Sequence, residues 1–154
     1  MRAALIFTLV CCAARAQDSQ NDWQKPEQVL RALSLKRSDA VAVLEPEAFL
    51  APLISNRVRV VGGMDAPAHS ADVVVLYDVL HGMDQRAQFY AKLHRVLQFG
   101  GRIVNIDFSS DPPGTVPSKS KLTEAQAADE FKAAGFRITQ TISSLPYQYI
   151  QVFQ

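Results

Sequence analysis

The stretch ADVVVLYDVLHGMDQRAQFYAKLHRVLQFGGRIVNIDF, residues 71–108, decides the fold. Residues 73–76 are apolar without alternation, which is typical of a strand covered on both faces. Apolar side chains then recur at helical spacing between Phe89 and Leu97, along a single stripe. Gly100 and Gly101 permit a turn, and a second apolar strand follows. The sequence therefore predicts a strand, an amphipathic helix and a second strand that returns parallel to the first.

Four further elements are predicted upstream of this unit. They are a helix, a strand, a helix and a strand, over residues 26–33, 40–44, 45–54 and 57–61. Pro26 suits the first turn of a helix. Glu45 and Glu47 lie in the first turn of the second helix, where the helix dipole favours acidic side chains. Residues 57–61 alternate between basic and apolar, which indicates a strand with one solvent-facing side.

The C-terminal part predicts one helix and two strands. Thr123 and Gln126 have the spacing of a capping box at a helix start, and Gly135 ends that helix. Residues 136–143 and 147–153 are two strand candidates whose short separation favours an antiparallel hairpin. Strands that alternate with helices and end in a hairpin indicate an α/β protein, with a mostly parallel sheet and helices on both faces.

The composition is that of one globular domain without a nucleic-acid signature. The chain has 154 residues, 48% of them hydrophobic, and a formal net charge of +1. We therefore expect one hydrophobic core and no nucleic-acid partner. The sequence has no metal-ligand spacing, serine-nucleophile elbow or phosphate-binding loop, so no metal site is expected.

The first sixteen residues, MRAALIFTLVCCAARA, predict a secretory signal peptide. Arg2 precedes a short apolar run, and residues 14–16 fit the small-x-small cleavage pattern. The run is too short to span a bilayer comfortably, although a buried N-terminal strand or helix is the alternative. We expect cleavage before Gln17, a flexible lead-in over residues 17–24, a domain over residues 25–154, and export to the periplasm or medium. Both cysteines of the chain would leave with the signal peptide.

Four segments together resemble the class I S-adenosylmethionine-dependent methyltransferases. They are ADVVVLYDVLHGM (71–83), LHRVLQFGGRIVNIDF (93–108), EFKAAGFRI (130–138) and the terminal LPYQY (145–149). The last resembles a bacterial subgroup that often carries a signal peptide. The resemblance implies a Rossmann-like fold, S-adenosylmethionine as cofactor and transfer of a methyl group to an acceptor, here a small molecule of unknown identity.

The sequence departs from that family after its first strand. The family binds its cofactor with a glycine-rich loop there, because glycine lets the backbone approach the ligand. Here residues 41–44 are followed by Glu45-Pro46-Glu47, with no glycine before Gly62. One βαβ unit takes about 30 residues or more, so residues 41–62 hold less than the family would place there. We therefore expect a sheet shortened by one strand–helix unit.

The resemblance points to three cofactor-binding candidates in the first half of the chain. Glu45 is the acid nearest to the family's ribose-binding position, although it can equally cap the following helix. Asp65 resembles the acid near which adenine binds, with Met64 as an apolar lid. As a turn residue in a loop, Asp65 would need no ligand.

Tyr77, Asp78 and His81 follow the central strand at its carboxyl end, where open α/β sheets bind ligands. Tyr77 is a cofactor-binding candidate. Asp78 could orient the substrate or the cofactor amine. His81 could act as a base, since the unperturbed pKa of histidine is about 6.5. Methyl transfer depends mostly on positioning, so His81 can also be a residue of the turn at Gly82.

Two functions are compatible with these features. The first is a working methyltransferase with an abbreviated cofactor site. The second is a degenerate, non-catalytic member of the family, retained as a binding or structural domain or encoded by an incomplete gene. The missing glycine loop and the expected export favour the second function, whereas the order and spacing of the matching segments favour the family itself.

Overall fold

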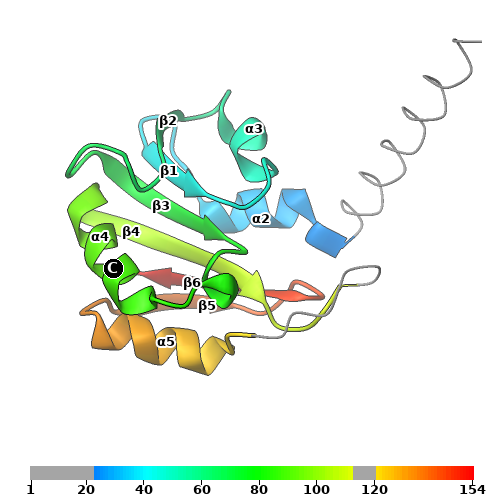
Figure 1. Ribbon diagram of the computed structural model, residues 1–154. Coiled ribbons are helices and arrows are strands. Elements are labelled where there is room, and N and C mark those ends of the chain that lie inside the picture. Colours follow the sequence, from blue (N-terminus) through cyan, green and yellow to red (C-terminus); the bar gives the residue numbers. More distant parts are fainter. Residues whose placement is uncertain (1–22, 113–120) are drawn as a thin grey trace, which may run out of the picture.

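The computed structural model describes residues 23–112 and 121–154 and contains one mixed six-stranded sheet (Figure 1). The strands are β1 (Ala40–Leu44), β2 (Arg59–Gly62), β3 (Ala71–Tyr77), β4 (Leu97–Phe108), β5 (Ile138–Ile142) and β6 (Gln148–Phe153). The helices are α2 (Pro26–Leu33), α3 (Leu50–Ile54), the short 3-10 helix η1 (Leu80–Gly82), α4 (Arg86–Val96) and α5 (Glu124–Ala133). The expected signal peptide and most of the expected lead-in lie outside the described residues.

The strand order is β2-β1-β3-β4-β6-β5. The first four strands pair in parallel, whereas β6 runs antiparallel to both β4 and β5. This confirms the predicted mostly parallel sheet with a C-terminal antiparallel hairpin. The chain goes from β1 outward to β2, then returns past β1 to β3 and continues to β4. The topological switch point, where ligands bind in open α/β sheets, therefore lies between β1 and β3.

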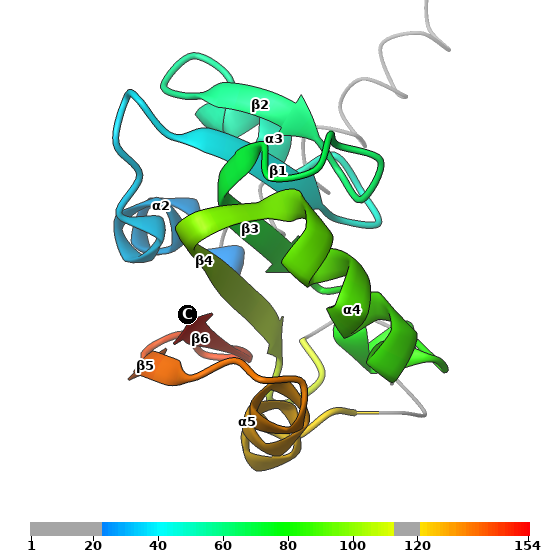
Figure 2. The same ribbon diagram turned by 90° about the vertical axis from the view of Figure 1, so that its left-hand side faces the viewer.

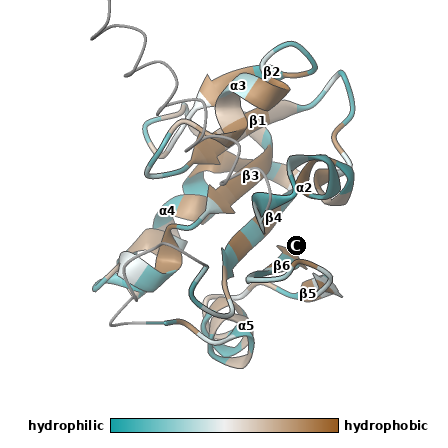
Figure 3. Cartoon of the chain, turned by 90° about the vertical axis from the view of Figure 1, so that its right-hand side faces the viewer, coloured by the Kyte–Doolittle hydropathy of each residue, from teal (hydrophilic) through white to brown (hydrophobic). Residues whose placement is uncertain are grey.

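Helices cover both faces of the sheet, and a hydrophobic core lies on each side. On one face, α4 and α5 bury Phe89, Leu93 and Phe131. On the other, α2 and α3 bury Leu33 and Ile54. Figure 2 shows α2 and α4 on opposite sides of the sheet, and Figure 3 shows the hydrophobic colouring of β1 and β3 between them. Because both faces are covered, the central strands are apolar at nearly every position.

The central unit forms as predicted, with one change at its second turn. Every member of the predicted helical stripe from Phe89 to Leu97 is buried. Strand β4, however, begins already at Leu97, so Gly100 and Gly101 lie inside it rather than in a separate turn. The pairing jumps from Ala71 opposite Leu97 to Val73 opposite Arg102. The glycines thus form an irregularity within β4.

The second predicted helix begins later than expected. It was predicted from Glu45, but α3 begins at Leu50, and residues 46–49 form a series of bends. The carboxylate of Glu45 accepts hydrogen bonds from backbone N–H groups at the start of α3. An acid that satisfies free N–H groups from outside the helix cannot also be part of its first turn. This explains the shift of the helix start.

The remaining elements follow the prediction with small shifts at their ends. Thr123 and Gln126 form the predicted capping box of α5, each side chain accepting from the backbone N–H of the other. Strand β2 is an edge strand, and Val60, which we expected on a covered face, is 39% exposed. In the described part of the chain, the helices are too short or too polar to cross a membrane.

Candidate active site

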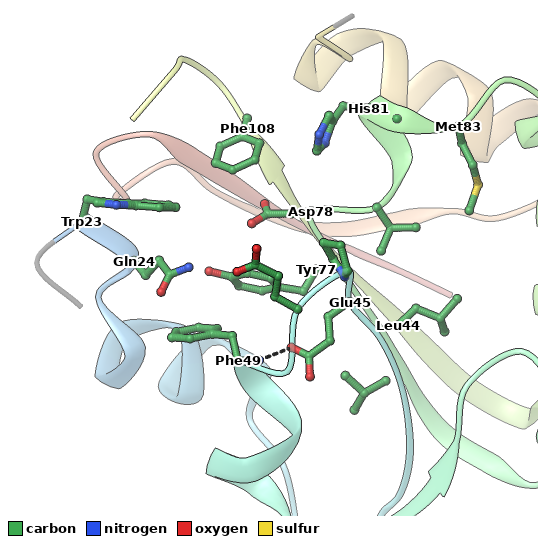
Figure 4. A pocket seen from close by; sticks show the side chains of 15 residues that line it. Trp23, Gln24, Leu44, Glu45, Phe49, Tyr77, Asp78, His81, Met83 and Phe108 are labelled. Carbon is green, nitrogen blue, oxygen red and sulfur yellow. Dashed lines mark hydrogen bonds between the residues drawn. The ribbon is translucent and has the colours of Figure 1, made fainter. Parts of the chain in front are cut away.

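A pocket of about 830 Å³ opens at the carboxyl ends of β1, β3 and β4 (Figure 4). Its floor is made by the residues that end β1 and β3 and begin the loops after them. This places the pocket at the topological switch point, where the diverging loops leave space above the sheet. A volume of this size is in the usual range for small-molecule sites, about 300–1,000 Å³.

The walls of the pocket are mainly aromatic and aliphatic. The lining residues with apolar side chains are Trp23, Val43, Leu44, Pro46, Phe49, Tyr77, Val79, Met83 and Phe108. Trp23 lies at 5.9 Å from Phe108 and at 6.4 Å from Tyr147, between ring centroids. Such flat, apolar walls suit a planar ring, for example a nucleobase.

Asp78 lies at the end of β3 in a left-handed backbone conformation, with φ of 55°. Its N–H donates to the carbonyl of Ile106 at 2.8 Å, and its Oδ1 accepts from Nε2 of Gln148 at 2.8 Å. Burial raises the pKa of the Asp78 carboxyl from 3.8 to about 7, and the charge of Asp107 acts in the same direction. The Gln148 hydrogen bond opposes this shift. Asp78 can therefore bind or release a proton near neutral pH.

His81, in η1, is held by the buried carboxylate of Asp107 at the end of β4. The distance from His81 Nδ1 to Asp107 Oδ1 is 2.7 Å, and the backbone N–H of His81 donates to Oδ2 at 3.0 Å. The hydrogen bond to Asp107 raises the pKa of His81 above the usual value, although partial burial opposes the shift. When Nδ1–H of neutral His81 donates to the Asp107 carboxylate, the lone pair of the ring is on Nε2. The pair is thus arranged as an oriented base.

Glu45 lines the pocket, and its carboxylate already accepts hydrogen bonds from the protein backbone. Oε2 accepts from the N–H groups of Phe49 (3.2 Å) and Leu50 (2.6 Å), and Oε1 accepts from Ala51 (3.0 Å). The helix-capping role that the sequence left open is therefore present. Oε1 retains a lone pair for a ligand hydroxyl, since each carboxylate oxygen can accept about two hydrogen bonds.

Tyr77 is a buried wall residue at the end of β3. Its ring lies 5.1 Å from that of Phe49, between centroids, in a tilted arrangement. Burial raises the pKa of its phenol above the ordinary value. The hydroxyl therefore stays protonated at neutral pH and can act as a hydrogen-bond donor.

Met64 and Asp65 are not among the residues that line this pocket. They lie in the loop between β2 and β3, where Asp65 is exposed and Met64 packs partly against the core. Nη2 of Arg95 donates to the carbonyl of Met64 at 2.7 Å, which ties the loop to α4. The structure thus brings Glu45, Tyr77, Asp78 and His81 together and leaves the other two candidates apart.

Several lining residues were not among the candidates predicted from sequence. Trp23 and Gln24 precede α2 and line the pocket. Gln24 is 7% exposed, and its Oε1 has no hydrogen-bond partner among the described residues. Phe108 ends β4, and this position could have identified it from the sequence, because the ends of parallel strands meet at one edge of the sheet. Gln148 donates to Asp78 without lining the pocket, and no signal in the sequence pointed to it.

The described residues contain no group of three or more histidine, cysteine or acidic side chains placed to hold a metal ion. A second pocket, of about 430 Å³, lies between α4 and α5. Arg86, Tyr90 and Glu130 line it, and the first two both donate to the Glu130 carboxylate, with Arg86 Nε 2.7 Å from Oε2. These contacts join the two helices and account for the charges there.

Comparisons with known proteins agree with the geometry of the first pocket. Residues 36–105 match a family model described as a methyltransferase domain. No curated protein sequence matches the chain. The matched segment runs from the turn before β1 into β4 and so includes the floor of the pocket.

The fold is shared with S-adenosylmethionine-dependent methyltransferases of known structure. An Aquifex aeolicus enzyme of this kind superposes with a TM-score of 0.70 at 14% identity, over 88% of this chain and 92% of that one. One from Mesorhizobium loti gives a TM-score of 0.62 at 11% identity, over 82% and 95%. The Burkholderia thailandensis 1,6-didemethyltoxoflavin-N1-methyltransferase, solved with its substrate and S-adenosylhomocysteine, gives 0.59 at 20% identity, over 98% and 87%.

These matches show that the chain has the Rossmann-like fold that class I methyltransferases share. The family model agrees with this fold and matches residues 36–105, a little less than half of the chain.

Proposed function

We propose that this domain binds S-adenosylmethionine in the pocket above β1 and β3 and transfers its methyl group to a small-molecule acceptor. The proposal is supported by one observation. Glu45, Tyr77, Asp78 and His81 all line a single pocket at the topological switch point of the sheet. When bound, S-adenosylmethionine supplies a methyl group made electrophilic by the attached sulfonium.

The residues of the pocket suit the cofactor in chemistry. Aromatic and aliphatic side chains such as Phe49 and Met83 can hold the adenine. Asp78 offers a carboxylate for the amino group of the methionine part, and Oε1 of Glu45 can accept a hydrogen bond from a ribose hydroxyl. Polar groups of this kind, on apolar walls, are typical of small-molecule sites.

His81 and Asp78 are the groups that can handle a proton in this pocket. The Asp107 carboxylate holds the His81 ring through Nδ1, which leaves the Nε2 lone pair as the basic site of the neutral ring. A nucleophile that carries a proton must lose it during methyl transfer. His81 can accept that proton, while the remaining lining residues position the acceptor.

The loop after β1 supports a second candidate function, a non-catalytic binding domain. Residues 45–49 contain no glycine. The backbone N–H groups of residues 49–51 donate to the carboxylate of Glu45. These donors are therefore committed within the protein. On this alternative, the domain retains the fold and the pocket but binds no S-adenosylmethionine.

Isothermal titration of the purified protein with S-adenosylmethionine separates the two functions. Saturable binding in the micromolar range, lost on Asp78→Ala, is expected for the methyltransferase. Absence of heat up to millimolar cofactor contradicts it and supports the non-catalytic domain. Titration with adenosine alone is the control for unspecific nucleoside binding.

We infer in addition that the chain is exported. The support is the charge, apolar run and cleavage pattern of residues 1–16, which lie outside the described residues. Expression in a bacterial host, followed by mass spectrometry of the N-terminus, tests this. A mature chain that begins at Gln17 is expected, and an intact Met1 on protein in the cytoplasm contradicts it.

A further inference from the structure

The described residues that line the pocket carry an unbalanced set of charges. Glu45, Glu47 and Asp78 contribute three carboxyl groups, whereas no lysine or arginine is among the lining residues in the described part of the chain. The ring of His81 is paired with the buried carboxylate of Asp107, so a proton on His81 is offset by that charge. A ligand with a positive charge is therefore favoured in this pocket over an anionic one.

The aromatic walls of the pocket also favour a positively charged ligand. Trp23 and Phe108 stand close together on one side, with ring centroids 5.9 Å apart, and Phe49 and Tyr77 stand on another, at 5.1 Å (Figure 4). The face of an aromatic ring attracts a cation, and aromatic groups beside carboxylates are a recurrent site for organic ammonium ions.

A buried acceptor adds a third observation. Gln24 lines the pocket and is 7% exposed, and its Oε1 has no hydrogen-bond partner among the described residues. A buried amide oxygen without a partner is costly, and a donor from a ligand would satisfy it. An ammonium group has several N–H donors and no acceptor, so it matches the acceptor-rich lining.

We propose that the acceptor for which this pocket is built is a small organic amine that binds as an ammonium cation. The inference rests on the proposed function and specifies its substrate class. With Glu45 and Asp78 facing the cofactor, Glu47, the Gln24 oxygen and the rings of Trp23 and Phe108 recognise the acceptor. Acceptors with a phosphate or carboxylate beside the reacting atom are disfavoured.

A bound ammonium must lose a proton before its nitrogen can act as a nucleophile. His81 lines the same pocket and can accept that proton. The exposed Glu47 is close enough for its charge to act on the carboxyl of Asp78. The carboxylates therefore attract the cation, and His81 converts it to the free amine.

The single tryptophan of the chain provides a direct readout, because Trp23 is a wall of the pocket. Tryptophan fluorescence of the full chain is followed during titration with three probes of one shape. They are 3,3-dimethylbutylamine, which binds as its ammonium ion, the neutral alcohol 3,3-dimethylbutan-1-ol, and the anion 3,3-dimethylbutanoate. We expect the ammonium probe to bind saturably and about tenfold more tightly than the neutral alcohol, with the carboxylate weakest. Equal or tighter binding of the alcohol or of the carboxylate overturns the inference.

Two variants test the assigned residues while they keep the fluorescent reporter. Glu47→Gln is expected to weaken binding of the ammonium probe about threefold and to leave the alcohol unchanged, as for an exposed charge. Phe108→Leu is expected to weaken binding of the ammonium probe by a similar factor through the lost ring face. Glu27→Gln, an exposed acid of α2 outside the pocket, is the matched control. Unchanged affinity for the ammonium probe in both pocket variants contradicts the proposal.

Calorimetry with S-adenosylmethionine distinguishes this inference from the proposed function. Binding of the cofactor with no preference for the ammonium probe overturns the amine acceptor and leaves methyl transfer intact. A preference for the ammonium probe without cofactor binding supports the cation site and overturns methyl transfer.

Discussion

Nδ1 of His81 lies 2.7 Å from Oδ1 of Asp107, and this contact joins the helix after β3 to the end of β4. The Asp107 carboxylate is fully buried and also accepts from the backbone N–H groups of His81 and Phe108. These three hydrogen bonds fix the carboxylate in place, and the carboxylate in turn keeps the histidine ring in one orientation. The site therefore has an oriented imidazole whose position does not depend on a ligand.

Removing the imidazole tests its role as a base. In His81→Asn, we expect methyl transfer to fall by about a hundredfold or more, as for loss of a general base. Affinity for S-adenosylmethionine, measured by calorimetry, is expected to stay within about twofold, because Asp78 and Glu45 remain. His94→Asn, at the end of α4 and away from the pocket, is the control. Equal losses of rate and cofactor affinity in His81→Asn would indicate a structural role instead.

The Asp107 carboxylate is expected to set the protonation of His81. The hydrogen bond and the charge of Asp107 both raise the pKa of His81. Asp107→Asn keeps the shape but removes the charge, so the pKa of His81 should fall, as followed by NMR titration of the ring protons. If the pKa of His81 stays where it is in the unaltered protein, the contact does not control the charge of the imidazole.

The pH dependence of stability is expected to follow Asp78. Burial raises the pKa of Asp78 to about 7, with added effects of Asp107 and Glu47, against those of Gln148 and His81. Between about pH 4 and pH 7, the Asp78 carboxyl is protonated in the folded protein but ionised in the unfolded chain, where its pKa is about 4. The free energy of unfolding therefore falls as pH rises through this range. His81, whose pKa is also raised, contributes stability that is complete below its unfolded pKa and lost as pH rises through its folded pKa.

Urea unfolding at several pH values measures this effect. Asp78→Asn can still accept from Gln148 but has no charge to bury, so its stability relative to the unaltered protein should increase as pH rises. Asp129→Asn, an exposed acid of α5, should show no such trend. A stability difference between Asp78→Asn and the unaltered protein that does not vary with pH contradicts the expected burial of this carboxyl.

Glu45 is expected to stabilise the fold through the start of α3. Its carboxylate accepts from three backbone N–H groups, and an amide has only one acceptor oxygen. Glu45→Gln should therefore lower the free energy of unfolding by about 1–3 kcal/mol, the cost of an unsatisfied buried donor. The exposed neighbour Glu47, changed to Gln, should stay within about 0.5 kcal/mol. Equal effects of the two changes would refute the capping role.

Gly101 and Gly82 differ in the space around them, so changing each to alanine tests whether a side chain fits at the start of β4. A Cβ at Gly101 would lie 2.9 Å from Cδ2 of Leu97 and 3.1 Å from the carbonyl oxygen of Asp72, whereas a Cβ at Gly82 would meet nothing within 4 Å. Gly101→Ala should cost about 1–3 kcal/mol in thermal or urea unfolding. Gly82→Ala should be neutral or stabilise by up to about 1 kcal/mol. A tolerated Gly101→Ala would show that β4 can relax at its irregular start.

Much of the fold could be predicted because it depends on local patterns. The buried runs of β1 and β3, the stripe of α4 and the capping box of α5 are periodic or short-range signals, and each formed as expected. The start of α3 was wrong because Glu45 bonds to N–H groups four to six residues ahead, in competition with the first helical turn. Propensity alone does not resolve such a competition.

Residues 71–108 by themselves determined the strand–helix–strand unit, its family resemblance and the sheet edge where Asp78 and His81 lie. Only the tertiary structure decided what these residues contact. Asp107 reaches His81 because parallel strands end side by side, and Gln148 reaches Asp78 from β6 because the hairpin returns antiparallel beside β4. Trp23 and Gln24 join the same pocket from the start of the packed domain. Contacts between residues this far apart in the chain arise from strand order and register, which no local pattern in the sequence encodes.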